Sequence, residues 1–201
     1  RGSPGEGGSD CVTKPLWEPS AVRIESANIT AFARSLGEEW GVRLDGYDAL
    51  WRFSVEEKEK FWRTVWREGG VIAETQGEIV IADPDKLPGA QFFPDARLNF
   101  AQNLLRRRDD ATAIVFRGED KVNRRLSSAE LYDMVSRLAT VLRAAGGGPG
   151  DRVAGYLPNM PETIMARLAA ASLGAVWSSC SPDFGTQGVL DRFGQIEPKV
   201  L

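Results

Sequence analysis

The chain has 201 residues, 42% hydrophobic and 26% charged, a composition typical of a folded domain with an appendage and not of a disordered, collagenous or coiled-coil protein. Its 25 basic and 28 acidic groups give a net charge of -3 without a concentrated basic face, so we expect no nucleic-acid partner. Histidine is absent, which excludes Ser-His-Asp and Cys-His catalysis within this chain. The two cysteines, Cys11 and Cys180, make neither a disulfide framework nor a metal site, which favours a reducing, cytoplasmic setting.

Neither the N-terminal segment nor the longest uncharged run has the pattern of a targeting or membrane element. Residues 1–10 are rich in Gly, Ser and Pro and lack the apolar core of a signal peptide, which predicts a flexible tail over 1–15. The longest uncharged run, between Arg167 and Asp183, contains several serines and Pro182, so it is too short and too polar to span a bilayer. We therefore expect no membrane partner.

Residues 28–68 are predicted to form two amphipathic helices around a Gly-containing turn. In the first, apolar residues recur at helical spacing up to Trp40, and Gly41 provides a stop. In the second, Ser54 and Glu57 have the spacing of a capping box ahead of an apolar flank. Most of the six tryptophans lie in this region, and their helical spacing favours packing over a stacking platform for bases or sugars.

A short strand over 78–82 and a Pro-rich connection predict a domain boundary, which we place between residues 95 and 96. A helix is predicted over 97–108. Its last three residues are arginines, and we expect them to complement the helix dipole in preference to binding phosphate. Segments 112–117 and 121–126 predict a hairpin with a short loop.

A long helix is predicted to begin at Ser127, which forms a capping box with Glu130, and to end at the glycine run 146–150. That run follows a helix and precedes a strand, the reverse of a phosphate loop, which favours simple helix termination. The remaining elements alternate between strand and helix, at 152–157, 161–174, 175–179, 186–196 and 199–201. This order predicts a parallel sheet with right-handed crossovers.

The predicted fold class is therefore α/β. A helical N-terminal extension over 16–95 is followed, over 96–201, by the first part of a doubly wound, mainly parallel sheet subdomain. The last predicted strand begins only at Lys199, and a sheet cut at that point would leave an exposed edge. We therefore expect the chain to be part of a longer protein.

Residues 176–185 read VWSSCSPDFG and follow a parallel strand, at the sheet edge where open α/β sheets bind ligands. Together with LPNMPE over 157–162 and LDRFGQIEPK over 190–199, this stretch resembles the acetoacetyl-CoA synthetases, which are acyl-adenylate-forming enzymes. Residues 98–105 and 51–66 are similar to the N-terminal part of the related acetyl- and propionyl-CoA synthetases.

The resemblance implies two-step chemistry in lipid metabolism. ATP converts a short carboxylic acid such as acetoacetate to an acyl-AMP with loss of diphosphate, and the CoA thiol then attacks, with Mg²⁺ neutralising the phosphates. It also implies that the phosphate loop, the nucleotide contacts and the adenylation lysine come after Leu201. The chain would then hold no catalytic residue and would be inactive alone, and Lys199 matches no catalytic position of the family.

Within the chain, the resemblance implies only the location of a CoA channel or acyl site, near Ser181, Pro182, Asp183, Phe184 and Gly185. The residues themselves leave open a structural role, in which Pro182 and Gly185 form a turn and Asp183 or Thr186 caps the next helix. Cys180, in uncharged surroundings, is predicted to be a buried, inert thiol. Two other functions stay open: activation of acetate or propionate, and a non-catalytic interaction module.

Overall fold

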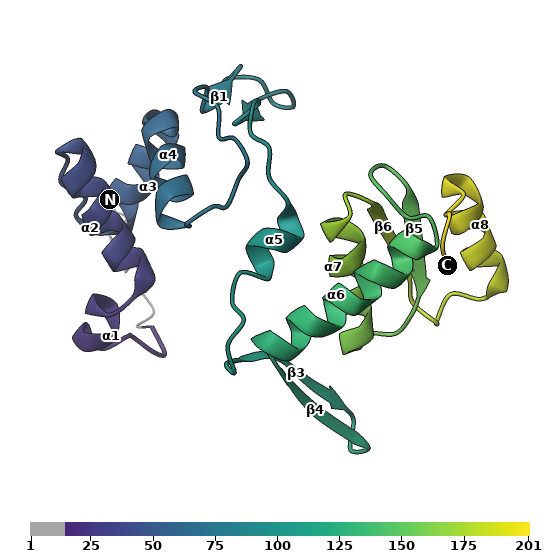
Figure 1. The fold of residues 1–201 in the computed structure, drawn as a ribbon. Helices are drawn as coiled ribbons and strands as arrows, with labels where there is room; N and C mark the ends of the chain where they lie inside the picture. Colours follow the sequence, from purple (N-terminus) through teal and green to yellow (C-terminus); the bar gives the residue numbers. More distant parts are fainter. Residues whose placement is uncertain (1–14) are drawn as a thin grey trace, which may run out of the picture. The chain divides into compact units, whose positions relative to one another are not determined.

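The computed structural model describes residues 15–201, and their contacts divide the chain into a helical unit that ends at Gly69 and an α/β unit over Gly70–Leu201 (Figure 1). The predicted flexible tail lies outside the described residues apart from residue 15, as does Cys11. No helix within 15–201 is both long enough and apolar enough to cross a membrane.

The described part of the helical unit holds four helices, α1 (Ala21–Glu25), α2 (Asn28–Trp40), α3 (Gly46–Glu56) and α4 (Lys58–Glu68). The first predicted helix is confirmed as α2, including its end. Gly41 adopts a left-handed φ of 65° and donates its N–H to the Gly37 carbonyl, which satisfies one of the last free carbonyls of the helix.

The second predicted helix is wrong in its start and in its cap. The chain forms α3 and α4 there, with non-helical Glu57 (φ -112°, ψ 51°) between them. Ser54 lies inside α3, where its Oγ donates to the Trp51 carbonyl, so no capping box forms with Glu57. A Ser followed three residues later by Glu also occurs within helices, where the hydroxyl bonds the preceding turn instead of a free N–H.

The core of the helical unit consists of Leu36, Leu50 and Phe53, which are buried. Phe32 and Trp40 are partly buried and pack against this core, as the helical spacing of the aromatic residues predicts. Trp51 points outward, with 55% of its surface exposed.

The α/β unit opens with two very short strands, β1 (Ile81–Ala82) and β2 (Gln91–Phe92), which pair antiparallel. The following helix, α5 (Phe100–Leu104), is shorter than predicted. Its N-terminus is set by Asn99, whose side chain accepts a hydrogen bond from the Gln102 N–H.

Because α5 ends at Leu104, the three arginines do not lie on its last turn, and the predicted dipole interaction is wrong. Each finds a separate partner. Arg106 donates to the Gly70 carbonyl, Arg107 pairs with Asp109, and Arg108 lies 3.9 Å from the centre of the Tyr132 ring.

Side-chain bonds of Asn103 attach residues 70–95 to α5, within the α/β unit. Its amide accepts from the Ile72 N–H and donates to the Ile72 carbonyl, both at 2.8 Å. Thr75 and Arg97 form a further antiparallel bridge. The contacts therefore divide the chain at Gly69/Gly70, upstream of the boundary expected at 95/96.

The hairpin is confirmed as β3 (Thr112–Gly118) and β4 (Val122–Ser127), followed by α6 (Ser128–Ala144). Both bonds of the predicted Ser127–Glu130 capping box are present. The glycine run ends the helix, since Gly147 donates its N–H to the Leu142 carbonyl.

The parallel pair β5 (Arg152–Tyr156) and β6 (Val176–Cys180) is joined by α7 (Pro161–Ser172), and α8 (Thr186–Ile196) follows. The predicted third strand is present only as a single parallel bridge between Val153 and Val200. Adjacent residues of β5 face opposite layers: Val153 packs in the cluster of α6 and α7, and Ala154 packs against Phe193 of α8 (Figure 1). The sheet is thus covered on both faces, which confirms the doubly wound α/β class.

Gly155 of β5 leaves space for a large aromatic side chain on the neighbouring strand β6. A Cβ at this position would lie 2.4 Å from the ring of Trp177, which belongs to the neighbouring strand. The absence of a side chain at Gly155 therefore lets the Trp177 ring lie close against β5.

Candidate functional site

The carboxyl ends of β5 and β6 lie at the same level, because Tyr156 is the register partner of Cys180. The segment 181–185, defined here as the β6–α8 loop, begins at this edge and leads into α8. Open α/β sheets bind ligands beyond the carboxyl ends of their strands, so this loop is the part of the chain best placed for a ligand.

A tight turn over Ser181–Phe184 sets the shape of the loop. The Phe184 N–H donates to the Ser181 carbonyl at 3.1 Å, and Pro182 occupies the second position, where its fixed φ suits such a turn. The Ser181 hydroxyl donates to the Asp183 carboxylate at 2.8 Å and accepts from the Asp183 N–H at 3.3 Å. The carboxylate of Asp183 is thereby oriented by the loop itself.

The structure corrects the predicted caps of α8. Gly185 is the N-cap residue, and it provides no side-chain hydrogen bond. Asp183 bonds Ser181 instead, and Thr186 is already the first residue of the helix. The structural role of this loop is therefore the turn at Pro182 and not a side-chain cap.

Two residues that the sequence reasoning did not single out hold the loop from outside. The Tyr156 hydroxyl lies 2.9 Å from the Pro182 carbonyl and 3.0 Å from the Phe184 carbonyl. The Arg192 guanidinium lies 4.2 Å from the centre of the Phe184 ring. Only the parallel register, which places the end of β5 beside the end of β6, brings Tyr156 to the loop.

Cys180 is buried with Ala154 and Phe193, as predicted. Its side chain packs between the strands and α8 and does not line the loop. The β6–α8 loop therefore has Ser181 and Asp183 as its polar side chains.

A charged pair lies at the start of α7, which follows β5. Arg124 of β4 donates to Oε1 of Glu162, and this hydrogen bond holds the pKa of Glu162 below its ordinary value. The other oxygen, Oε2, is buried and accepts no hydrogen bond from the described residues. The pair ties the hairpin to α7.

Lys199 forms a second charged pair, at the opposite end of β5. Its Nζ lies 3.2 Å from the Asp151 carboxylate, and this hydrogen bond lowers the pKa of Asp151. The same carboxylate accepts from the Gly148 N–H. Lys199 thus joins the final residues to the glycine run.

Within residues 15–201, no three His, Cys, Asp or Glu side chains lie close enough together to hold a metal ion. Asp183 in the loop bonds Ser181, and Glu162 at the start of α7 pairs with Arg124.

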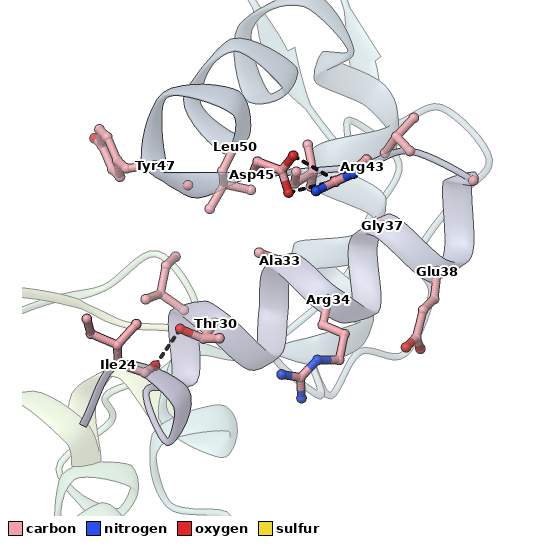
Figure 2. A pocket seen from close by; sticks show the side chains of 15 residues that line it. Ile24, Thr30, Ala33, Arg34, Gly37, Glu38, Arg43, Asp45, Tyr47 and Leu50 are labelled. Carbon is pink, nitrogen blue, oxygen red and sulfur yellow. Dashed lines mark hydrogen bonds and ion pairs between the residues drawn. The ribbon is translucent and has the colours of Figure 1, made fainter. Parts of the chain in front are cut away.

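The largest cavity described, with a volume of 810 Å³, lies in the helical unit between α2 and the start of α3 (Figure 2). Figure 2 shows Ala33 and Leu50 on opposite sides of it, whereas Arg34 and Glu38 point away. Arg43 and Asp45 at its rim pair with each other. Its lining includes no serine, cysteine or lysine, and its hydroxyl groups are those of Thr30 and Tyr47.

Family models match both halves of the chain. The model described as AMP-binding enzyme matches residues 100–201, and the model described as acetyl-coenzyme A synthetase N-terminus matches residues 47–104. The second match includes α3, α4, β1, β2 and α5, so it crosses the division between the two units.

Curated relatives match over nearly the whole chain. An acetoacetyl-coenzyme A synthetase of Rhizobium meliloti is 54% identical over 188 residues, which are 94% of this chain and 29% of that protein. An acetoacetyl-CoA synthetase of Macaca fascicularis is 38% identical over 92% of this chain and 28% of its own length. The chain thus spans less than a third of these relatives.

A solved structure shows the same fold. The acetoacetyl-CoA synthetase from Streptomyces lividans superposes with a TM-score of 0.85 at 46% identity, over 92% of this chain and 29% of that one. The AMP-binding model covers half of the residues, including β3 to α8 and the β6–α8 loop. The chain therefore belongs to the AMP-binding enzyme family.

Proposed function

We propose that this chain is part of an acetoacetyl-CoA synthetase. The observation that carries the proposal is the 54% identity to an acetoacetyl-coenzyme A synthetase over 94% of the chain. The superposition on the Streptomyces lividans acetoacetyl-CoA synthetase, with a TM-score of 0.85 at 46% identity, also supports it.

The proposed reaction has two steps. In the first, a carboxylate oxygen of acetoacetate attacks the α-phosphorus of ATP, which forms acetoacetyl-AMP and releases diphosphate. In the second, the CoA sulfur attacks the acyl carbon, the bond to the AMP oxygen breaks, AMP leaves and the thiol proton passes to solvent. Neither step needs a histidine, which agrees with the composition of this chain.

In this proposal the described residues form a scaffold, and some of them line one side of the site at which the second step takes place. The β6–α8 loop, with Ser181, Pro182, Asp183, Phe184 and Gly185, lies near the channel for CoA or the acyl group. Its place beyond the carboxyl ends of two parallel strands supports this assignment. The enzyme would act on a small carboxylic acid in the cytoplasm, within lipid metabolism.

The test is ATP–diphosphate exchange by the full-length protein, with acetoacetate, acetate and propionate compared at equal concentrations. We expect acetoacetate to give the fastest exchange. Faster exchange with acetate would favour the second candidate, an acetyl-CoA synthetase, which the N-terminal family model supports. The 201-residue chain alone is expected to show no exchange, and turnover by it would contradict the assignment of a scaffold.

A further inference from the structure

We infer that Tyr156 is a positioning residue for the CoA-dependent step, because it sets the conformation of the β6–α8 loop. The inference rests on the proposed function and adds to it a residue outside the loop. Tyr156 is the last residue of β5, and its hydroxyl reaches the backbone carbonyls of Pro182 and Phe184, 26 and 28 positions further along the chain.

The two carbonyls that Tyr156 contacts flank the tip of the turn. Pro182 and Phe184 enclose Asp183, so the single O–H proton of Tyr156 is shared between carbonyls on both sides of that residue. The remaining bonds of the turn, from the Phe184 N–H to the Ser181 carbonyl and between Ser181 and Asp183, lie inside the loop. Those bonds set the curvature of the turn, whereas the Tyr156 bonds fix its place relative to the sheet.

A second contact anchors the loop on its other side. The Phe184 ring lies under the Arg192 guanidinium, at 4.2 Å from its centre. Tyr156 from the sheet and Arg192 from the helix therefore hold the same turn. Of the two, Tyr156 contacts the backbone directly, so its loss should displace the turn without removing a side chain from it.

The chain supplies a matched pair of variants. Tyr156→Phe removes the hydroxyl and keeps the ring. Tyr132→Phe removes a hydroxyl that forms no hydrogen bond among residues 15–201, and it keeps the ring that faces Arg108. Both variants are made in the full-length synthetase.

Two kinetic measurements separate the steps. ATP–diphosphate exchange reports adenylation without CoA, and acetoacetyl-CoA formation at varied CoA concentration reports the second step. We expect Tyr156→Phe to raise the KM for CoA by about three- to tenfold, which is the effect of one neutral hydrogen bond. The rate of ATP–diphosphate exchange should stay unchanged. Tyr132→Phe should leave both unchanged.

Hydrogen exchange provides a readout that does not depend on activity. The amides of Asp183 and Phe184 should exchange faster in Tyr156→Phe than in Tyr132→Phe. An unchanged KM for CoA together with unchanged exchange of these amides would overturn the inference. An equal loss in both chemical steps would also overturn it, because Tyr156 would then be a general structural residue.

The proposed function can fail separately. If the unmodified protein shows no acetoacetate-dependent exchange, the proposed function is wrong. The amide exchange of Asp183 and Phe184 then decides alone whether Tyr156 holds the loop: faster exchange supports that part of the inference, and unchanged exchange refutes it.

Discussion

The helical unit and the α/β unit are stabilised in different ways. In the helical unit the buried core is small, consisting of Leu36, Leu50 and Phe53, and a buried polar residue, Thr64, lies between its helices. In the α/β unit one continuous apolar cluster extends from α5 through α6 and α7 to β5. A small unit buries a smaller fraction of its surface, so individual polar bonds carry more of its stability.

The polar network of the helical unit links α2 to α4. The Trp40 indole N–H donates to the Thr64 hydroxyl at 2.9 Å, and that hydroxyl donates to the Glu39 carboxylate at 2.6 Å. Arg67 pairs with the same carboxylate. Thr64 is fully buried, so its hydroxyl has exchanged water for these two partners.

The largest expected effect concerns apolar packing in the α/β unit. Leu168→Ala in α7 should lower the free energy of unfolding by about 2–5 kcal/mol, because it removes buried methyl groups and leaves a cavity. Urea unfolding measures the loss. The exposed Val141→Ala in α6 is the control and should change stability little, since 62% of the Val141 surface is exposed. Equal losses in both variants would contradict the description of this core.

Thr64→Val tests whether polar hydrogen bonds stabilise the helical unit. It keeps the shape but leaves the Trp40 N–H without its acceptor and removes one of the two donors to the Glu39 carboxylate, so we expect a loss of about 1–3 kcal/mol. Thr64→Ser retains the hydroxyl and should cost less. Amide hydrogen exchange in α2 and α4 measures both. If valine is tolerated better than serine, the helical unit depends on apolar packing in the same way as its neighbour.

Asn103→Ala tests which contacts determine where the α/β unit begins. Without the two bonds to Ile72, residues 70–95 lose part of their attachment to α5, at a cost of about 1–2 kcal/mol. Limited proteolysis should then cleave this segment faster. Gln102→Ala, on the exposed side of α5, is the matched control. Unchanged cleavage after Asn103→Ala would mean that other contacts determine where the α/β unit begins.

The smallest expected effect is a pH dependence at the hairpin. The pKa of Glu162 is lowered in the folded chain by Arg124, so its contribution is present above the ordinary carboxyl pKa and is lost as the pH falls through the lowered value. Glu162→Gln should cost about 0.5–1 kcal/mol at neutral pH and progressively less in acid. Urea unfolding between neutral and acidic pH measures this difference. A stability loss in Glu162→Gln that does not change with pH would contradict a role for the Arg124–Glu162 pair.

Local signals explain most of what was predicted correctly. The Gly41 stop, the Ser127–Glu130 capping box and the bounds of α8 are each set by bonds within about one helical turn. The predictions that were wrong rest on sequence patterns that are compatible with more than one local structure. Ser54 with Glu57 matches a capping box but occurs at a helix end, and Arg106 follows a helix shorter than its apolar pattern predicted.

The amino-acid order by itself determined the alternation of helices and strands in the α/β unit and the resemblance carried by residues 176–185, because these depend on neighbours in sequence. Only the tertiary structure decided which distant groups meet. Tyr156 reaches Pro182 across 26 positions, Asn103 reaches Ile72 across 31, and Arg124 reaches Glu162 across 38. Such bonds form between elements that the sheet register and the helix packing bring together, and no periodicity within one element encodes them.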